Sequence, residues 1–252
     1  MRNPKGKGKG FGKRVALIIF LALLVFLGIV VYRYFTTVHD AVEAEVSPYF
    51  TKTSDGVSVS YIDEGVFIDS PATDKAVIYY PGCKVEYSSY VPFCYELAKQ
   101  GFDVFIVKVK LNFALFDKAA GQKIMDKYDY DSWILMGHSM GGIAISSFAD
   151  EKGDAVKGLV LLGAHGTPDL TDTDITTLVL YGSEDGVVQR KKVEAGRTKL
   201  AKEGNYHELE ISGGNHALWG NYGDQAMDGE AKISQKEQFD AAITEIVKYF
   251  GK

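Results

Sequence analysis

A serine framed by glycines is the first place in this sequence where chemistry is expected. Ser139 lies between Gly137 and Gly141 in the sequence GHSMGG. The apolar residues 133–136 precede it and predict a buried strand, and residues 143–149 can continue as a helix. A G-x-S-x-G sequence on a strand-to-helix turn is the pattern of a nucleophile elbow. We therefore expect Ser139 to be a nucleophile.

The residue types around Ser139 have a physical reason. The serine must adopt a strained backbone conformation to project its hydroxyl, and glycines leave room where strand and helix pass closely. The start of the helix directs backbone N–H groups to the point where negative charge develops during the reaction. The backbone N–H of Met140 is therefore the expected first donor of an oxyanion hole.

A serine hydroxyl is a poor nucleophile at neutral pH, so Ser139 needs a base and an acid that orients the base. On an elbow of this kind the acid follows the serine along the chain, and the histidine follows the acid. Asp185 lies in a turn after a predicted strand, where an aspartate is also a common helix cap, and Glu184 is the alternative acid. His216, in the glycine-rich sequence GGNHA, is the expected base.

The other histidines fit the role of base less well. His138 occupies the variable position of the elbow, and we expect its side chain to point away from the chemistry. His207 begins a predicted strand, and His39 follows the apolar N-terminal run. His165 comes after a predicted strand and fits either the lining of a pocket or an ordinary loop.

The second donor of the oxyanion hole is expected in the turn after the first central strand, where the sequence reads YPGCKV. Gly82 lets the backbone approach closely, and the N–H of Cys83 is the expected donor. Cys83 as a rival nucleophile lacks an elbow around it. Lys84 either brings positive charge to the mouth of the pocket or pairs with Glu86 or with solvent.

Apolar runs and helical patterns alternate from residue 75 onward, which predicts an α/β fold with a mostly parallel sheet covered on both faces. Strands are expected at residues 57–62, 76–80, 104–109, 133–136, 158–162, 177–181 and 207–211, and helices at 88–100, 116–127, 143–149, 187–203 and 235–250. Reactive groups in such sheets gather at the carboxyl ends of the strands. Ser234 and Glu237 predict a capping box for the last helix.

The N-terminus differs in composition from the rest of the chain. Six basic residues precede an uninterrupted apolar run over residues 15–32, and no acidic residue comes before Asp40. A helix of that length, at about 1.5 Å per residue, approaches the thickness of the hydrocarbon core of a bilayer. The run is longer than the roughly 7–15 residues of a signal peptide, and no small-residue cleavage site directly follows it.

We therefore expect a retained membrane anchor, with a cleaved signal peptide as the alternative. The basic residues place the N-terminus in the cytoplasm and the catalytic domain on the other side of the cell membrane. The predicted domains are a basic cytoplasmic tail (residues 1–14), a transmembrane anchor (15–35), a linker (36–55) and a catalytic domain (56–252).

Charge and cysteine content exclude several partners. Without the seven basic residues up to Arg33, 21 of the 28 Lys and Arg remain against 33 Asp and Glu. This excess of acid, about −12, argues against a surface for nucleic acids or anionic lipids on the domain. Cys83 and Cys94 are expected to be free thiols rather than a disulfide framework. No metal site and no other cofactor are predicted, and the sequence does not determine the oligomeric state.

From residue 75 to the C-terminus the sequence resembles the α/β-hydrolase superfamily, and more narrowly a group of bacterial, often membrane-anchored α/β-hydrolases. The resemblance is carried by residues 80–85, 137–142, 181–186 and 213–217, and extends to residues 221–224 and 233–234. It implies a Ser139–Asp185–His216 triad. Cys83 stands where the relatives are expected to have glycine. The group is often described as similar to dienelactone hydrolases, but those enzymes use a cysteine nucleophile, so we do not expect that substrate.

The resemblance also implies the α/β-hydrolase fold without a large cap domain, because residues 163–176 are too few for the insertion that capped relatives carry. We expect a carboxylic-ester hydrolase that works through an acyl-enzyme on a small or envelope-associated ester. An amidase, peptidase or thioesterase would use the same triad. A non-catalytic binding protein on a hydrolase fold is the alternative of another class.

Overall fold

The computed structural model describes residues 9–52, 55–71 and 73–251. The chain forms two compact units, Met1–Val38 and His39–Lys252. The described part of the first unit is the helix α1, Lys9–Thr36, in which the stretch Phe11–Thr36 is long and apolar enough to cross a membrane. A signal sequence near an N-terminus has the same properties. Residues 1–8 of the predicted basic tail lie outside the described residues.

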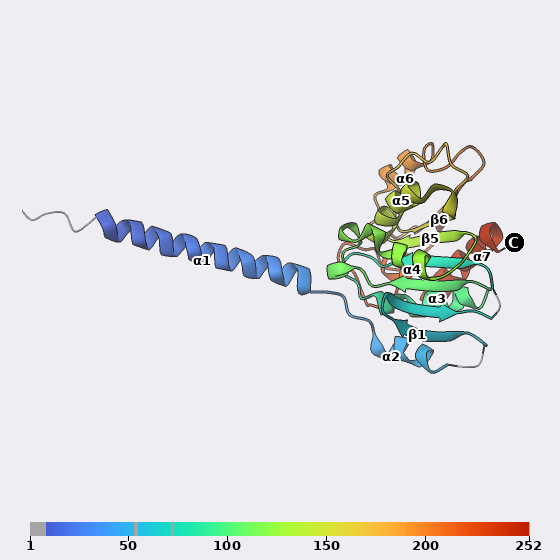
Figure 1. Ribbon diagram of the computed structural model, residues 1–252, viewed down its shortest axis with the longest axis horizontal. Helices are drawn as coiled ribbons and strands as arrows, with labels where there is room; N and C mark the ends of the chain where they lie inside the picture. The colour runs from blue at the N-terminus through green and yellow to red at the C-terminus, as the bar shows by residue number, and fades with distance from the viewer. Residues whose placement is uncertain (1–8, 53–54, 72, 252) are drawn as a thin grey trace, which may run out of the picture. The chain divides into compact units, whose positions relative to one another are not determined.

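An eight-stranded sheet forms the centre of the second unit, counted over the residues that the structure describes (Figure 1). Its spatial order is β1-β2-β4-β3-β5-β6-β7-β8. The strands are β1 Ser58–Ile62, β2 Gly65–Asp69, β3 Ala76–Tyr80, β4 Asp103–Val107, β5 Trp133–His138, β6 Val156–Leu162, β7 Thr176–Gly182 and β8 Tyr206–Ile211. β2 is antiparallel to both β1 and β4, and all pairings from β4 to β8 are parallel. The predicted fold class is confirmed, whereas β2 was not predicted.

The central strands are continuously apolar because both faces of the sheet are covered. Along β3, Val77 and Tyr79 join one buried apolar cluster, and Ile78 and Tyr80 join the other. The helices of the unit are α2 Glu43–Val46, α3 Val91–Ala98, α4 Gln122–Lys127, α5 Met140–Lys152, α6 Arg190–Gly196 and α7 Gln235–Phe250. Residues of α3 and α7 belong to the first cluster, and residues of α4, α5 and α6 belong to the second. Alternate side chains of a strand point to opposite faces, so the two groups of helices cover opposite sides of the sheet.

The last helix begins where the sequence predicts. The Ser234 hydroxyl accepts the backbone N–H of Glu237, whose carboxylate accepts the backbone N–H of Ser234 in return, so the capping box is confirmed. The helices α3, α4 and α6 are shorter than the predicted ones, whereas α5 is longer than the predicted residues 143–149. Within residues 187–203 the helix α6 starts only at Arg190, because the N–H groups of Val187 and Val188 donate to the Asp185 carboxylate and hold a turn there.

The predicted linker, residues 36–55, contains ordered structure that packs within the second unit. Residues 39–46, which we call the strap, form α2 at their end and bury Val46. The N–H of His39 donates to the carbonyl of Lys84 at 2.6 Å, and the N–H of Val42 donates to the carbonyl of Asn221 at 2.8 Å. Residues 53–54 of this range lie outside the described residues.

Candidate active site

The elbow forms where β5 ends and α5 begins. Ser139 lies between them with φ 53° and ψ −124°, a conformation that residues with a side chain avoid. A Cβ atom on Gly141 would lie 2.4 Å from the carbonyl oxygens of Tyr80 and Pro81, and one on Gly137 would lie 2.7 Å from the backbone of Gly141. The glycines are therefore required by the close approach of the backbone segments, and the strained conformation expected of Ser139 is present.

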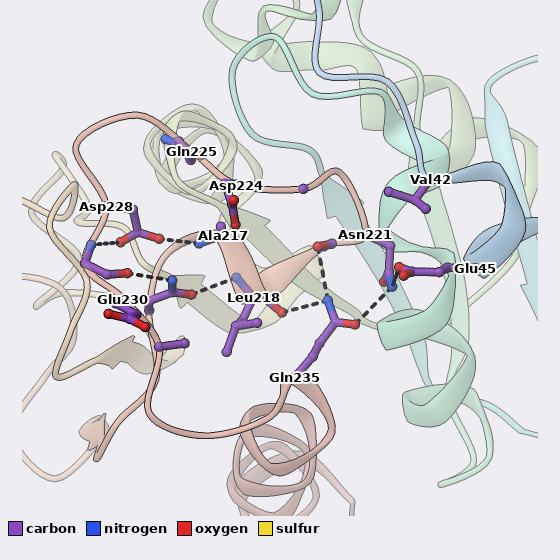
Figure 2. Close-up of a pocket in the computed structure, with 15 residues that line it drawn as sticks. Val42, Glu45, Ala217, Leu218, Asn221, Asp224, Gln225, Asp228, Glu230 and Gln235 are labelled. Carbon is purple, nitrogen blue, oxygen red and sulfur yellow. Dashed lines mark hydrogen bonds between the residues drawn. The ribbon is translucent and has the colours of Figure 1, made fainter.

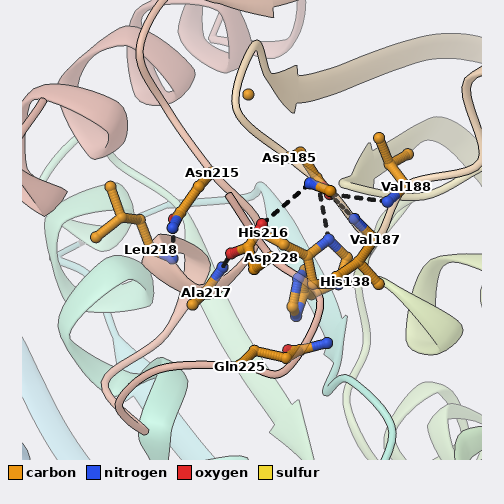
Figure 3. A network of polar contacts seen from close by, with 12 residues as sticks. His138, Asp185, Val187, Val188, Asn215, His216, Ala217, Leu218, Gln225 and Asp228 are labelled. Atoms are coloured by element: carbon orange, nitrogen blue, oxygen red, sulfur yellow. Dashed lines mark hydrogen bonds and ion pairs between the residues drawn. The ribbon is translucent and has the colours of Figure 1, made fainter. Parts of the chain in front are cut away.

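His216 and Asp185 form a buried pair. The distance between His216 Nδ1 and Asp185 Oδ2 is 2.8 Å, and their side chains are 1% and 0% exposed (Figure 3). The other carboxylate oxygen of Asp185 accepts the N–H groups of Val187 and Val188 at 2.9 and 2.8 Å. Asp185 therefore caps the following turn and orients His216 at the same time. The alternative acid, Glu184, instead forms an ion pair with Lys232.

The ring nitrogen of His216 that faces away from Asp185 is available to accept a proton. Because the ionised carboxylate can only accept, Nδ1 carries the proton in the pair with Asp185, and Nε2 of the neutral ring keeps a free lone pair. Nε2 is buried and has no hydrogen-bond partner among the residues that the structure describes. His216 can therefore accept a proton from a group that approaches Nε2.

Gly163 makes room for this pair and was not predicted. It follows β6 with φ 53°, and a Cβ atom there would lie 2.8 Å from His216 Nδ1 and 2.9 Å from Asp185 Oδ2. Its backbone N–H is held by the carbonyl of Leu180 at 2.7 Å, so the segment cannot easily move away. A single glycine directly after an apolar strand is the indication in the sequence that would have identified it.

The loop after β3, residues 81–85, presents one unused backbone donor. The N–H of Gly82 donates to the Tyr90 hydroxyl at 3.0 Å, and the N–H of Lys84 donates to the carbonyl of Asn112 at 2.7 Å. The N–H of Cys83 between them has no acceptor among the described residues. Met140 is the first residue of α5, so its N–H has no partner within the helix. Both predicted oxyanion donors are thus available for a ligand.

The thiol of Cys83 is poorly suited to be a nucleophile. Cys83 is half-buried and not in a disulfide, and burial raises its pKa to about 11, against a smaller lowering by Lys84. The thiolate, which is the reactive form, is therefore rare at neutral pH. Cys94 in α3 is free and fully buried, and burial raises its pKa well above the ordinary value.

The expectation that His138 points away from the chemistry is wrong. His138 is the last residue of β5, and its ring centroid lies 4.4 Å from that of His216 (Figure 3). Its Nδ1 is 2.9 Å from the hydroxyl of Tyr90. Burial, and then the charge of His216, lower the pKa of His138 well below its ordinary value, so its ring is neutral. The position before the serine carries no fixed residue type in the elbow pattern, so the sequence held no indication of this contact.

The remaining predicted pocket residues lie around these loops. Gly82 faces Tyr90 and His138, since a Cβ atom on it would lie 2.9 Å from both the Tyr90 hydroxyl and His138 Nδ1. Lys84 has φ 59°. His165 is buried two residues beyond Gly163, and burial together with Lys192 and Lys199 lowers its pKa.

A cavity of about 520 Å³ lies beside the loop that carries His216 (Figure 2). Its lining includes Asn215 and Ala217 but none of Ser139, Asp185 and His216. The lining has four acidic residues and no basic one: Glu45, Asp224, Asp228 and Glu230. Asp228 has a structural role, because it accepts the N–H of Ala217 at 2.8 Å and that of Gly186 at 3.1 Å. Among the described residues, no three His, Cys, Asp or Glu side chains gather to hold a metal ion.

Comparison with known families agrees with the fold. Residues 76–240 match the model of the alpha/beta hydrolase family. The chain belongs to the alpha/beta hydrolase family. As a hydrolase of this fold, it resembles many solved structures. No curated protein was found to be similar in sequence.

Three of these structures show how far the likeness extends. A CIB-like hydrolase from Thermoplasma acidophilum has a TM-score of 0.56 and 13% identity, over 76% of this chain and 98% of that one. A hydrolase from Agrobacterium vitis has a TM-score of 0.53 and 13% identity, over 77% and 98%. The thioesterase domain of the curacin biosynthetic pathway has a TM-score of 0.52 and 11% identity, over 76% and 99%. At these identities the likeness is one of fold.

Proposed function

We propose that this hydrolase is a membrane-anchored serine hydrolase that cleaves carboxylic esters. Ser139 is the nucleophile, His216 is the general base, and Asp185 orients His216. The observation that carries the proposal is the buried 2.8 Å pair of His216 and Asp185, which leaves the second nitrogen of His216 without a partner next to the elbow loop. A non-catalytic binding protein would have no need to keep this buried nitrogen unpaired, since such an atom costs about 1–3 kcal/mol.

The reaction proceeds in two halves. In the first, Ser139 Oγ attacks the ester carbonyl while His216 Nε2 takes the hydroxyl proton, and the protonated His216 then gives that proton to the leaving alcohol. The negative charge on the carbonyl oxygen is stabilised by the N–H groups of Cys83 and Met140. In the second half, water attacks the acyl-enzyme while His216 Nε2 takes a proton from it, and His216 then gives this proton to Ser139 Oγ as the acid product leaves.

No hydrogen bond joins Ser139 to His216 in the structure. Hydrogen bonds of this type are often long in the absence of substrate and tighten when the substrate binds. The free position of Nε2 is compatible with a hydroxyl that reaches it only during the reaction.

Labelling with a fluorophosphonate probe tests the nucleophile. The probe reacts with an activated serine, so the full-length protein is expected to be labelled and the Ser139→Ala variant is not. Serine residues outside the elbow, such as the buried Ser146, provide the control, because Ser146→Ala is expected to leave labelling unchanged. An unlabelled but folded wild-type protein would favour the binding-protein alternative.

The ester class is proposed from the short connection between β6 and β7. Residues 163–175 join the two strands without an inserted domain. A hydrolase without a cap domain at this point can admit acyl groups of different lengths, and an envelope-associated ester is a suitable substrate for an enzyme held at the membrane. Amides and thioesters remain the competing substrates, because the same residues serve all three. Nitrophenyl esters of graded chain length, compared with matched amides and thioesters, decide between them by kcat/KM.

The anchor is proposed from α1. Its segment Phe11–Thr36 contains an 18-residue window with a mean hydropathy of 3.2 and no buried residues, as a helix surrounded by lipid would have. The basic residues before it place the N-terminus in the cytoplasm and the hydrolase unit across the membrane.

A further inference from the structure

Two buried side chains connect the loops of the proposed active site and are not used by the mechanism above. Tyr90 lies in the 3₁₀ turn Tyr87–Tyr90, His138 ends β5, and both are inaccessible to solvent. The Tyr90 hydroxyl accepts the N–H of Gly82 at 3.0 Å and lies 2.9 Å from Nδ1 of His138. The pair therefore joins the loop after β3 to the elbow.

The direction of these hydrogen bonds follows from proton counting. Burial raises the pKa of Tyr90 well above its ordinary value, so the hydroxyl keeps its proton. The hydroxyl oxygen already accepts from Gly82, and its single proton can be given only to Nδ1 of His138, the other polar atom within hydrogen-bond distance. In this arrangement Nδ1 of His138 is an acceptor, and the neutral ring carries its proton on Nε2, which has no hydrogen-bond partner among the described residues.

The same ring supports His216. The two imidazole rings are inclined at 48° with their centroids 4.4 Å apart, and the Asp185 carboxylate holds His216 at one nitrogen only. A single hydrogen bond leaves the ring free to tilt, whereas a packed neighbour restricts the tilt. His138 remains neutral when His216 gains a proton, because burial disfavours a second charge there.

We propose that His138 and Tyr90 are positioning residues for the reaction of the proposed function. Tyr90 takes up the N–H of Gly82 and thereby fixes the loop after β3, so that the neighbouring N–H of Cys83 is held toward the oxyanion. His138 accepts the hydrogen bond of the Tyr90 hydroxyl and so orients it. The ring of His138 also packs on the ring of His216 and holds it against Asp185. The hydrogen bonds from Gly82 to Tyr90 and from Tyr90 to His138, with the packing of His138 on His216, form one continuous support.

The chain offers a matched control for a purely structural role. Tyr79, in β3, is as buried as Tyr90, and the two ring centroids are 4.9 Å apart. Its hydroxyl has no hydrogen-bond partner among the residues that the structure describes. Tyr79→Phe and Tyr90→Phe each remove one hydroxyl from the same part of the core. The hydroxyl of Tyr79, however, makes no hydrogen bond to the proposed site.

The experiment measures kcat and KM of the full-length protein with a short-chain nitrophenyl ester. Tyr90→Phe is expected to lower kcat at least about tenfold with KM nearly unchanged, because the oxyanion donor is misplaced mainly in the transition state. Tyr79→Phe is expected to keep the wild-type kcat. His138→Asn retains an acceptor where Nδ1 lies and is expected to retain more activity than His138→Leu, which has none. Near-UV circular dichroism shows which variants are folded.

Equal kcat values for Tyr90→Phe and Tyr79→Phe would overturn the inference, as would equal losses in folded His138→Asn and His138→Leu. Nitrogen-15 NMR of histidine-labelled protein tests the network apart from activity. It is expected to show His138 with a bare Nδ1 and a protonated Nε2, and the Nδ1 resonance is expected to shift in Tyr90→Phe. A proton on Nδ1 contradicts the network. If the wild-type protein does not react with fluorophosphonate while this NMR pattern is present, the proposed function fails and the network stands.

Discussion

Asp185 differs from its neighbour Glu184 in what its carboxylate contacts, and this difference decides which acid orients His216. Asp185→Asn is expected to lower kcat roughly 10³- to 10⁴-fold with little loss of fold, because an amide no longer stabilises the protonated imidazole or fixes its tautomer. Kinetics with a nitrophenyl ester check this.

Glu184→Gln is the control for that measurement. Glu184 contacts Lys232 and Ser183 rather than His216, so its replacement is expected to leave kcat within about twofold of wild type, as for other exposed pairs. A large loss in Glu184→Gln together with a small loss in Asp185→Asn would reverse the assignment of the acid.

The thiol of Cys83 should react slowly in spite of its place beside the site. With a pKa of about 11, only about one thiol in 10³ is ionised at pH 8, roughly a hundredfold fewer than at an ordinary pKa of 9.0. Alkylation by iodoacetamide is expected to be slow at pH 8 and to accelerate about tenfold per pH unit up to pH 10. The unfolded protein serves as the control, and equal rates before and after unfolding would contradict the burial of this thiol.

At the scale of single elements, α5 has a glycine near each end that meets different surroundings. Gly141→Ala would drive a Cβ atom into two backbone oxygens at 2.4 Å, whereas nothing lies within 4 Å of a Cβ atom on Gly153. Gly141→Ala is expected to cost more than about 2 kcal/mol of unfolding free energy and to abolish any activity toward a nitrophenyl ester. Urea denaturation and kinetics measure the two effects.

Gly153 has φ 51°, so Gly153→Ala introduces backbone strain without a collision. With ψ −122° this conformation lies outside the left-handed helical region, so the cost is expected to be about 1–3 kcal/mol, with activity retained in the folded fraction. Equal costs and equal activities of the two variants would show that close packing at the elbow is not what requires Gly141.

The strands β7 and β8 share an acid-sensitive carboxylate. Glu208 accepts hydrogen bonds from Arg197, Tyr206 and Tyr181, and these partners, Arg197 first, lower its pKa from 4.5 to about 2. A folded-state pKa below the unfolded value stabilises the protein above pH 4.5, and this stability is lost as the pH falls toward 2.

Glu208→Gln is therefore expected to be less stable than wild type at pH 7, with the difference shrinking between pH 4.5 and pH 2. Thermal unfolding at several pH values measures it. Glu245→Gln, which removes a surface ion pair with Lys248, is the control and is expected to change stability little. A stability difference that is independent of pH would contradict the charged role of Glu208.

Elements with a local cause were predictable from the sequence, and contacts made through space were not. The elbow at Ser139 and the capping box at Ser234 depend on residues within four positions of each other, so their pattern is visible along the chain. β2 escaped prediction because its five residues are stabilised by pairing with β1 and β4, and its three apolar residues, 66–68, are too short a run to indicate a strand by themselves. The His138–His216 contact joins residues 78 positions apart and depends on how two loops fold over the sheet.

For the whole molecule, the decisive question is whether α1 is retained. The intact mass of the protein from a membrane fraction is expected to include residue 1 or to lack only the initiator methionine. Extraction with carbonate should leave the protein in the membrane, because a helix with an uninterrupted apolar run over residues 15–32 is not removed by high pH. A mature N-terminus beyond residue 36 would establish a cleaved signal peptide instead. In that case the ester-hydrolase proposal is unaffected, since the site lies entirely within residues 39–252.

The strap has a practical consequence for anyone who prepares the hydrolase unit without its helix. The boundary that the sequence predicts, residue 56, would remove the donors to the carbonyls of Lys84 and Asn221, and would remove Val46 from the buried apolar cluster. The shortened enzyme would lack the hydrogen bond that holds the loop after β3, which carries the proposed oxyanion donor Cys83. We therefore expect it to be a poor catalyst. A soluble form should begin no later than His39, where the second compact unit starts, so that weak activity is not mistaken for the wrong substrate.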